Sequence, residues 1–259
     1  MLVGTSGWQY KDWRDRFYPR EVAHRLWLEH YAAAFGTVEV NNAFYRLPER
    51  ATFEDWRART PDDFVVTVKA SRFLTHVKRL REPREPVERL MDRAAGLGRK
   101  LGPVLLQLPP TLPADAAALA ATLDAFPSGV RVAVEPRHDS WWTGEVRDVL
   151  QSHNAALCWS DRKGRPRSPL WRTADWGYLR LHEGRAAPWP RYGRSALSTW
   201  IGRIDEAFPG QAKTRPTFYV YCNNDPGAAA IADAAAFAHL AERRGLAVGR
   251  APQRLPNWS

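Results

Sequence analysis

The segment from Arg131 to Trp142 brings together residue types that proton-transfer chemistry requires. Its first part is apolar and β-branched, and Glu135 ends that run directly before a proline, an arginine, a histidine and, shortly afterwards, two tryptophans. This pattern is typical of a buried parallel strand where it leaves a sheet and opens onto a site. We expect Glu135 to be the centre of that site. Partial burial should raise its pKa toward the range in which a carboxyl group acts as a general base or acid.

Polar residues interrupt other short apolar segments with a period of two, which separates the two faces of a strand. In the segment 37–41 the two valines share one face, and Glu39 and Asn41 share the other. Because the aliphatic face must pack against helices, we expect the polar face to point into the fold. The alternation brings the following side chains toward one axis: Glu39, Asn41, Lys69, Gln107, Glu135, Arg137, Arg180, His182 and Asn223. Ser6, Ser160 and Asp161 are expected to border the same opening.

Short apolar segments alternate with longer amphipathic segments along the whole chain. The predicted strands are residues 2–6, 37–41, 64–69, 104–108, 130–135, 155–160, 177–182 and 217–223. The predicted helices are residues 21–35, 52–59, 85–100, 114–126, 144–153, 195–208 and 225–244. The link 161–176 is too basic and too rich in proline for a regular helix. Asp225 and Pro226 are expected to begin the last helix as its cap and first residue, with Gly245 just beyond its end.

This alternation of strands and helices implies parallel strands, and eight such units close into a barrel. We therefore predict an α/β fold, a single (β/α)8 TIM-type barrel over residues 1–259 with an irregular sixth βα connection. An open doubly wound sheet is the alternative. No Gly-x-Gly-x-x-Gly follows the first predicted strand, which argues against that alternative and against a dinucleotide cofactor. In TIM barrels the carboxyl ends of the strands carry the chemistry.

Four residues of the polar set are predicted to be catalytic: Glu135, His182, Lys69 and Glu39. Glu135 would act as the general base or acid, and His182 or His138 would be its partner in proton transfer.

A cationic opening is expected from Lys69, Arg137 and Arg180, and it would suit a phosphate, a carboxylate or an enolate-like charge. The structural alternative is that these charges only pair with one another inside the barrel, with Glu39 and Lys69 on adjacent strands as the first expected pair. Buried ion pairs often gain little over apolar packing, which favours a functional pocket.

No metal and no cofactor are expected. The chain has no His-x-x-x-His pair or closely spaced acid cluster, and the lysine and arginines would compete with a metal cation. Cys158 and Cys222 lie in apolar segments and offer neither a disulfide framework nor a zinc site, which favours a reducing compartment. The chain has no basic-then-apolar leader and no apolar run near the about 18 residues that span a bilayer. We expect a cytoplasmic protein without a membrane partner.

The net charge of +10 and the pI near 10.0 favour anionic ligands. Arginines are scattered along the chain, so a generally basic surface is one interpretation, and attraction to RNA, DNA or an acidic partner is another. The densest basic segment, 76–84, is interrupted by acids and prolines, as in a loop. A small anionic or sugar-like substrate is therefore favoured over nucleic acid.

Aromatic residues gather in the loops after the first, second and fifth predicted strands: Trp8, Tyr10, Trp13, Phe44, Tyr45, Trp141 and Trp142. Flat rings beside hydrogen-bonding groups suit the apolar faces of a sugar, or could stack a nucleic-acid base. Alternatively they only pack the loops into a rigid lid. The segment 251–259 is expected to be an extended tail on the surface.

Seven ordered motifs resemble those of the YecE-like family. They are 4–10 (GTSGWQY), 38–45 (VEVNNAFY), 66–71 (VTVKAS) with Thr75 and His76, 105–110 (LLQLPP), 134–141 (VEPRHDSW), 179–182 (LRLH) and 220–225 (VYCNND). The resemblance implies a TIM-type barrel of uncharacterised activity, sometimes related to sugar isomerases. Its implied site residues are Glu39, Asn41, Lys69, His76, Gln107, Glu135, Arg137, His138, Arg180, His182, Asn223 and Asn224. This chain departs from the family at Glu183, which precedes Gly184, and at Ala43.

Three functions are compatible with this pattern. The first is an enzyme that isomerises or hydrolyses a sugar or anionic sugar-like metabolite by acid–base chemistry. Its predicted substrate-binding residues are Asn41, Gln107, Arg137, His138, Arg180, Asn223, Asn224, Tyr45, Trp8, Trp141 and His76. The second is a barrel that binds or processes nucleic acid, and the third is a metabolite-binding protein without catalysis.

Overall fold

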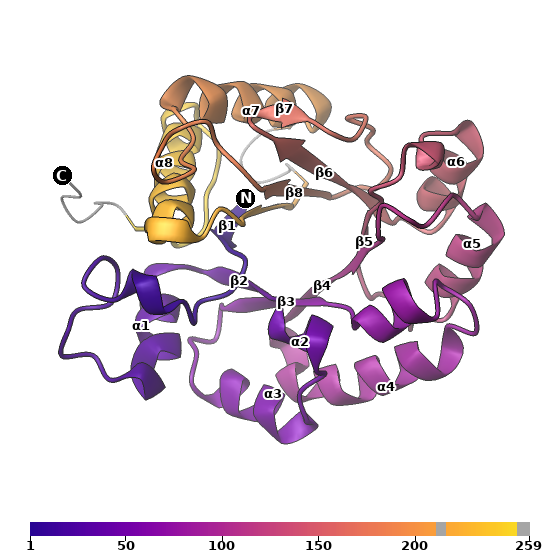
Figure 1. The fold of residues 1–259 in the computed structure, drawn as a ribbon, viewed down its shortest axis with the longest axis horizontal. Helices are drawn as coiled ribbons and strands as arrows, with labels where there is room; N and C mark the ends of the chain where they lie inside the picture. The colour runs from indigo at the N-terminus through magenta and orange to yellow at the C-terminus, as the bar shows by residue number, and fades with distance from the viewer. Residues whose placement is uncertain (211–215, 253–259) are drawn as a thin grey trace.

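The computed structural model describes residues 1–210 and 216–252. Eight parallel strands follow one another in the spatial order β1-β9-β8-β6-β5-β4-β3-β2, and helices surround them (Figure 1). The strands are β1 Leu2–Thr5, β2 Thr37–Val40, β3 Val65–Lys69, β4 Leu101–Gln107, β5 Val132–Glu135, β6 Ala156–Arg162, β8 Gly177–Leu181 and β9 Phe218–Cys222. The predicted (β/α)8 TIM-type barrel is confirmed.

The barrel closes between β1 and β2 through a close backbone approach. Ser6, just beyond the end of β1, forms a parallel bridge with Glu39 of β2. A Cβ atom on Gly4 would lie 2.3 Å from the Thr37 carbonyl oxygen, so only glycine lets the strands approach this closely. The Tyr31 hydroxyl accepts from the Thr5 amide at 2.9 Å and donates to the Thr37 carbonyl at 3.1 Å. The Tyr31 side chain therefore links β1 to β2 where the barrel closes.

The sixth connection is irregular, as predicted. Strand β7, Arg165–Pro166, turns back and pairs antiparallel with the end of β6. A loop then leads to β8 without a helix. This hairpin stands at the carboxyl end of the barrel strands, and it brings several arginines there.

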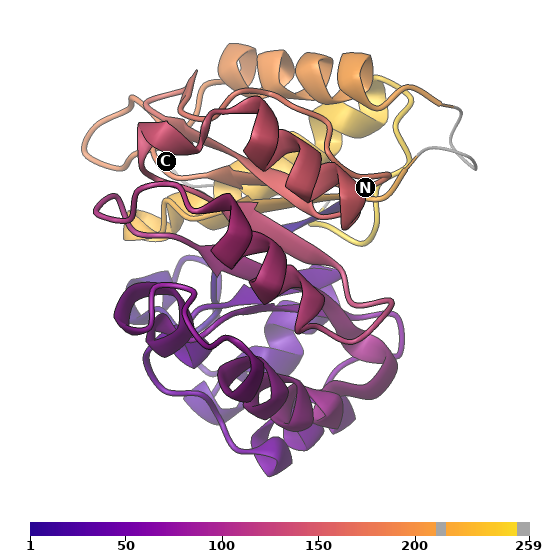
Figure 2. The same ribbon diagram turned by 90° about the vertical axis from the view of Figure 1, so that its right-hand side faces the viewer.

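The helices are α1 Trp27–Ala34, α2 Asn42–Tyr45, α3 Arg50–Ala58, α4 Arg84–Ala94, α5 Ala116–Asp124, α6 Gly144–Ser152, α7 Arg194–Ala207 and α8 Ala229–Arg243. They lie outside the strands, as the side view also shows (Figure 2). Helix α2 was not predicted, and α1 begins six residues later than the predicted position 21 because a 3₁₀ turn at His24–Leu26 precedes it. None of the helices in residues 1–210 and 216–252 is both long and apolar enough to span a membrane.

The predicted cap of the last helix is wrong. Asp225 has helical backbone angles and its side chain makes no capping hydrogen bond, while a 3₁₀ turn at Pro226–Ala228 separates it from α8. The Asp12 carboxylate takes that role instead, accepting from the Gly227 amide at 2.8 Å. Gly245 does follow α8 in the left-handed conformation, at φ 80°. The predicted surface tail falls almost entirely outside the described residues.

Two apolar layers confirm the predicted alternation of strand faces. Valines of β2, β3 and β5 pack outward against the helices in one large core cluster. A second, smaller cluster fills the barrel interior with residues of the opposite faces: Leu105, Ala133, Ala156, Cys158, Tyr178, Tyr219 and Tyr221, together with Ala174 and Trp176 from the segment before β8. The polar side chains of the predicted set belong to this inner face. The strands themselves position Glu39, Lys69, Gln107, Glu135 and Arg180, whereas Asn41, Arg137, His182 and Asn223 lie one or two residues beyond the strand ends.

Candidate functional site

Arg180 is the centre of the polar layer inside the barrel. Its guanidinium is 0% exposed and spans two carboxylates, with Nη2 2.8 Å from Glu39 Oε1 and Nη1 2.7 Å from Glu135 Oε2. Nη2 also donates to the Ser6 hydroxyl at 3.1 Å. A planar guanidinium with several fixed donors can bridge two acids in this way, whereas a lysine ammonium is a point charge.

The expected ion pair of Glu39 with Lys69 is therefore wrong. Glu39 is fully buried, and its carboxylate accepts from Arg180, from the Ser6 hydroxyl and from the Tyr178 hydroxyl. The structure gives it no ion pair with Lys69. Adjacency of strands suggested the wrong partner, because the long Arg180 side chain reaches across the barrel.

Glu135 is 1% exposed and receives donors on both oxygens. Gln107 Nε2 donates to Oε2 at 2.8 Å, beside the contact with Arg180. His182 Nε2 lies 2.8 Å from Oε1, and Arg137 Nη2 lies 3.4 Å from the same oxygen. Burial alone raises the pKa of Glu135, but the charges of Arg180, His182 and Arg137 outweigh burial and hold that pKa well below its ordinary value. The expected upward shift is wrong, and Glu135 is ionised at neutral pH.

His182 is held on both sides of its ring and through its backbone. Its Nε2 faces Glu135, and its Nδ1 lies 2.9 Å from the side-chain nitrogen Nδ2 of Asn223. The His182 amide donates to Asp161 Oδ1 at 2.8 Å, and the Tyr192 hydroxyl donates to the same carboxylate. Asp161 was predicted only to border the opening, and no local sequence signal indicated Tyr192. Together they fix the start of the loop after β8.

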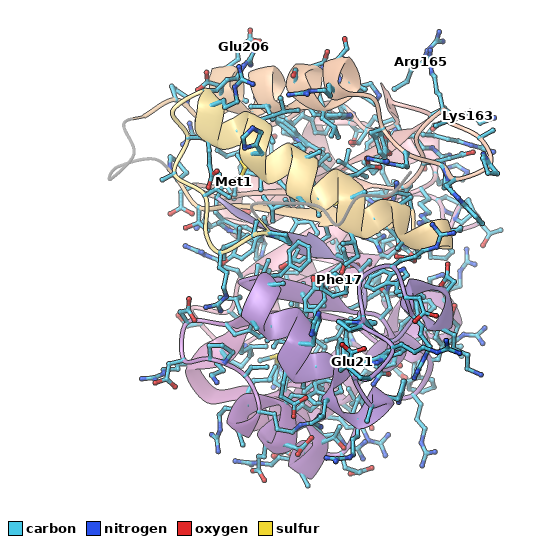
Figure 3. All side chains as sticks on the ribbon, turned by 90° about the vertical axis from the view of Figure 1, so that its left-hand side faces the viewer. Met1, Phe17, Glu21, Lys163, Arg165 and Glu206 are labelled. Carbon is cyan, nitrogen blue, oxygen red and sulfur yellow. The ribbon has the colours of Figure 1, made fainter. Side chains whose placement is uncertain are left out.

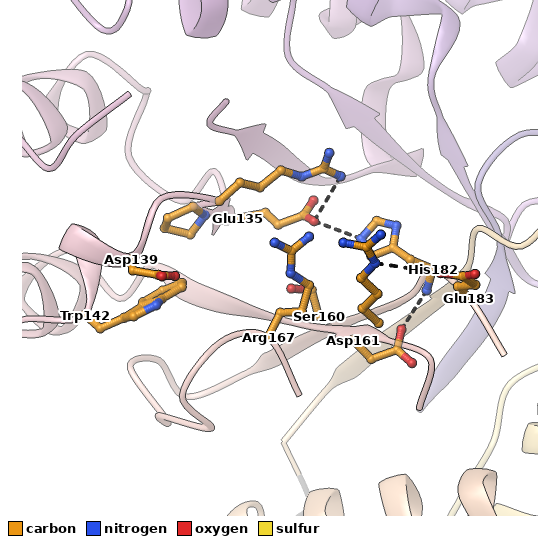
Figure 4. Close-up of a pocket in the computed structure, with 11 residues that line it drawn as sticks. Glu135, Asp139, Trp142, Ser160, Asp161, Arg167, His182 and Glu183 are labelled. Atoms are coloured by element: carbon orange, nitrogen blue, oxygen red, sulfur yellow. Dashed lines mark hydrogen bonds and ion pairs between the residues drawn. The ribbon is translucent and has the colours of Figure 1, made fainter. Parts of the chain in front are cut away.

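A cavity of about 270 Å³ opens above this network. Glu135 and His182 contribute to its floor, and its walls include Arg137, Arg162 and Arg167. Figure 4 shows the Arg167 side chain extending from the β6–β7 hairpin toward Glu135. Asp139, Asp161 and Glu183 also line the cavity, as does Trp142. The sequence prediction missed Arg162 and Arg167, because they lie in the connection that had no regular pattern.

Lys69 lies beside this network at the end of β3. It is 8% exposed, and its Nζ lies 4.2 Å from the centroid of the Phe44 ring. Burial and the charge of Arg180 lower its pKa to about 8, although Glu39 and Glu135 act in the opposite direction. Its environment therefore differs from that of an exposed lysine, whose pKa is about 10.4.

Other predicted ligand-binding residues have structural contacts of their own. Trp141 is fully buried and donates from Nε1 to the Leu112 carbonyl at 2.8 Å, so its neighbour Trp142 lines the cavity instead. Asn224 is buried away from the cavity and donates to Asp233 at 2.7 Å. His138 holds a short turn, with its Nδ1 3.2 Å from the Ser140 amide.

The aromatic residues near the first two strands lie apart from the Glu135–His182 pair. Trp8 is nearly buried and packs edge-on against Trp56, but it also lines a small second cavity with Asn41. Tyr45 is 76% exposed. His76 packs edge-on against Phe44, and burial and the charge of Lys69 lower its pKa.

Asn41 donates to the Ser6 hydroxyl at 2.9 Å, and its buried Oδ1 has no partner. Within residues 1–210 and 216–252, no three His, Cys, Asp or Glu side chains are grouped so that they could hold a metal ion. The two carboxylates nearest the axis, Glu39 and Glu135, are both engaged by Arg180.

Comparisons with known proteins agree with this fold. The model of a family described as "Protein of unknown function DUF72" matches residues 2–257. The UPF0759 protein YunF of Bacillus subtilis (strain 168) is 30% identical over 116 residues, which cover 42% of this chain and only 40% of that protein.

Two solved structures of DUF72 family proteins superimpose on nearly the whole chain. The protein from Thermotoga maritima MSB8 is 26% identical, with a TM-score of 0.79 over 93% of this chain and 98% of that one. The protein from Enterococcus faecalis V583 is 18% identical, with a TM-score of 0.77 over 98% and 99%, and supports the fold alone. The resemblance of the motifs is thus confirmed, and the chain belongs to the DUF72 family, to which the YecE-like proteins correspond.

Proposed function

We propose that this protein is an enzyme that transfers a proton on a small anionic, sugar-like metabolite. His182 would be the proton-transfer group and Glu135 its ionised partner. One observation carries the proposal: the Glu135–His182 pair lies at the floor of a cavity whose walls hold Arg137, Arg162 and Arg167. Such a cavity combines a site for negative charge with a base beside it.

The hydrogen bonds support different roles for the two ring nitrogens of His182. An ionised carboxylate only accepts, so Nε2 of His182 carries the hydrogen that faces Glu135. In the neutral ring Nδ1 is then the basic nitrogen, and it accepts from Nδ2 of the Asn223 side chain. A substrate that displaces this amide would deliver its proton to Nδ1. Glu135 would stabilise the imidazolium formed, as the carboxylate does in a catalytic triad, and the arginines would stabilise the negative charge left on the substrate.

Anion binding is tested with two arginines of one hairpin. Arg167 lines the cavity, whereas Arg165 is exposed on β7 and does not. Arg167→Ala should weaken the binding of D-gluconate 6-phosphate about tenfold, because a charge-assisted hydrogen bond contributes roughly 1.5–3 kcal/mol at most. Arg165→Ala should leave the affinity unchanged. Calorimetric titration measures both affinities. Equal affinities for the two variants would contradict the proposal that this cavity binds the anion.

Proton transfer is tested by exchange in D₂O. Wild-type protein incubated with a panel of sugar phosphates and sugar acids should introduce deuterium at a carbon of at least one compound, as read by NMR. His182→Gln should slow the exchange about 100-fold or more, the usual loss for a general base. His138→Gln, which removes a histidine that does not line the cavity, is the matched control. Binding without exchange would favour the metabolite-binding alternative and overturn the catalytic one.

The nucleic-acid alternative is favoured by one surface. The β6–β7 hairpin carries Arg162, Lys163, Arg165 and Arg167, and Arg185 donates to the Lys163 carbonyl from the next loop. Lys163 and Arg165 point away from the barrel (Figure 3). If this surface bound RNA, affinity would fall steeply with added salt, and Arg165→Ala would reduce that slope. Failure to retain RNA or DNA at low salt would eliminate this alternative.

A further inference from the structure

Lys69 is a buried amine without a polar partner. Its Nζ takes part in no hydrogen bond or ion pair with residues 1–210 and 216–252, although the side chain is only 8% exposed. The two carboxylates near it, Glu39 and Glu135, are already engaged by Arg180. Nζ is not one of the fully buried polar atoms without a hydrogen-bond partner. Since it has no such partner, this nitrogen keeps some contact with solvent. The amine is thus accessible and has no hydrogen-bond acceptor among these residues, and it lies over the Phe44 ring at 4.2 Å from the centroid.

The surroundings shift this amine toward its neutral form. Burial and the positive charges of Arg180 and Arg137 lower the pKa of Lys69 to about 8, and the negative charges of Glu39 and Glu135 do not restore it. His76 and Arg72 also face this region from the loop after β3. At pH 8 about half of the Lys69 side chains are neutral, against well under one in a hundred for an exposed lysine. Only a neutral amine is a nucleophile.

We infer that Lys69 forms an imine with the carbonyl carbon of an anionic aldehyde or ketone. The inference rests on the proposed function and names its substrate class. The position of Lys69 supports it. The residue ends β3, and its amine is close enough to Arg137 and Glu135 for their charges to act on it. Lys69 does not itself line the cavity, but Arg137 and Glu135 do, and the arginines there would hold the anionic group. Carboxyl ends of barrel strands are where such groups act.

The step balances without any oxidant or reductant. The lone pair of Nζ forms a bond to the carbonyl carbon, and the π pair moves to oxygen. The two hydrogens of the neutral amine pass to that oxygen, which leaves as water, and a carbon–nitrogen double bond remains. Protonation of the imine then draws electrons from the neighbouring carbon, so that a base such as His182 can remove its hydrogen. The amine and the Glu135–His182 pair would thus act in sequence on one substrate.

Reductive trapping tests this inference. The whole protein is incubated at pH 8 with limiting glyoxylate and sodium cyanoborohydride, which leaves a carboxymethyl group wherever an imine formed, and peptide mapping locates it. The competing amines are few, and peptide mapping separates them. They are the N-terminal amine, whose neutral fraction at pH 8 is also about half, and the lysines other than Lys69, which are Lys11, Lys78, Lys100, Lys163 and Lys213. Lys69 should carry at least about tenfold more label than exposed Lys163, because its neutral fraction is roughly 100-fold larger. Lys100, which is buried but fully hydrogen-bonded, should carry none.

The outcomes separate this inference from the proposed function. Label on Lys69 no greater than on Lys163 overturns the imine, even if His182-dependent deuterium exchange is present. Label on Lys69 without any exchange supports the amine and overturns the proposed proton transfer. Lys69→Arg keeps a cation at this position, so it should retain the affinity for D-gluconate 6-phosphate while all label at the site disappears. Lys69→Gln removes the cation. If wild-type Lys69 carries no more label than Lys163 and Lys69→Gln loses as much affinity as Arg167→Ala, Lys69 acts only as an anion-binding cation and the inference is overturned.

Discussion

Two buried lysines stand at opposite ends of neighbouring barrel strands and have opposite environments. Lys100 directly precedes β4 and is 4% exposed, and its Nζ donates to the Arg57 carbonyl at 2.6 Å and to the Thr60 carbonyl at 2.7 Å. Lys69 ends β3, which pairs in parallel with β4, and has no acceptor among the described residues. The fold can satisfy a buried ammonium with backbone oxygens. At the carboxyl end it does not.

Neutral and acidic groups repeat this contrast. Inside the barrel the Tyr221 hydroxyl lies 2.7 Å from Thr37 Oγ1 and 2.8 Å from Thr67 Oγ1. Near the carboxyl ends, Asn41 Oδ1 and Asp225 Oδ1 are buried without partners, and burial raises the pKa of Asp225 to about 7. Unpaired buried polar groups cost free energy, so their concentration at one end indicates where stability has been given up for chemistry.

The largest effect on the free energy of unfolding is expected for Arg180, which pairs with both Glu39 and Glu135 at the carboxyl ends of the strands. Arg180→Met would leave Glu39 and Glu135 as buried carboxylates without their shared cation, and should lower the free energy of unfolding by about 3–5 kcal/mol at pH 7. The folded-state pKa of Glu135 is lowered, so its wild-type contribution exists above the unfolded pKa and is lost as pH falls through the folded value. The loss in Arg180→Met should therefore be smaller below about pH 4.5 than at pH 7 in denaturant titrations. A loss independent of pH would contradict this account.

Removing the unsatisfied lysine should have the opposite sign. Lys69→Met keeps the length of the side chain and removes a charge whose pKa falls from 10.5 to about 8. At about 1.4 kcal/mol per unit, the free energy of unfolding should rise by up to about 3 kcal/mol at pH 7. The penalty of the wild-type lysine is full below pH 8 and disappears as the unfolded chain deprotonates near pH 10.5, so the gain should shrink between those values. A variant less stable than wild type at pH 7 would show that Lys69 is structural.

Lys100→Met is the matched substitution at the other end. It leaves the Arg57 and Thr60 carbonyl oxygens without the ammonium donor, and should lower the free energy of unfolding by about 1–3 kcal/mol. Exposed Lys163→Met controls for the loss of a lysine. Lys69→Met and Lys100→Met should shift the free energy of unfolding in opposite directions. A shift in the same direction would contradict the claim that Lys100 is stabilised by its acceptors while Lys69 lacks them.

Local periodicity was enough to predict which side chains enter the barrel. The valines of β2 pack outward and Glu39 inward, because the pleat alternates faces whatever the rest of the chain does. Partner choice was not predictable in this way. Glu39 takes Arg180 from across the barrel in place of Lys69 from the next strand, since barrel closure brings β2 and β8 within reach of a long side chain.

The same limit explains the errors at Glu135 and in the aromatic residues. Burial of Glu135 was predicted, but the direction of its pKa depends on donors from β4, β8 and the loop beyond β5, which meet only in the folded barrel. Trp141 and Trp142 are adjacent and chemically identical, so nothing local decides which one is buried. The arginines of the β6–β7 hairpin were missed because that link shows no hydrophobic periodicity of a strand or a helix.

The smallest effect is expected for a satisfied neutral group far from the cavity. Tyr221→Phe removes the hydroxyl between Thr37 and Thr67, and should lower the free energy of unfolding by about 1 kcal/mol. Thr37 keeps a bond, since its hydroxyl also donates to the Val65 carbonyl at 2.9 Å, which limits the loss. Denaturant titration measures the change, and binding of D-gluconate 6-phosphate and labelling of Lys69 should be unaltered. A change in either would mean that the interior and the carboxyl end are coupled, because Tyr221 contacts neither Lys69 nor the cavity.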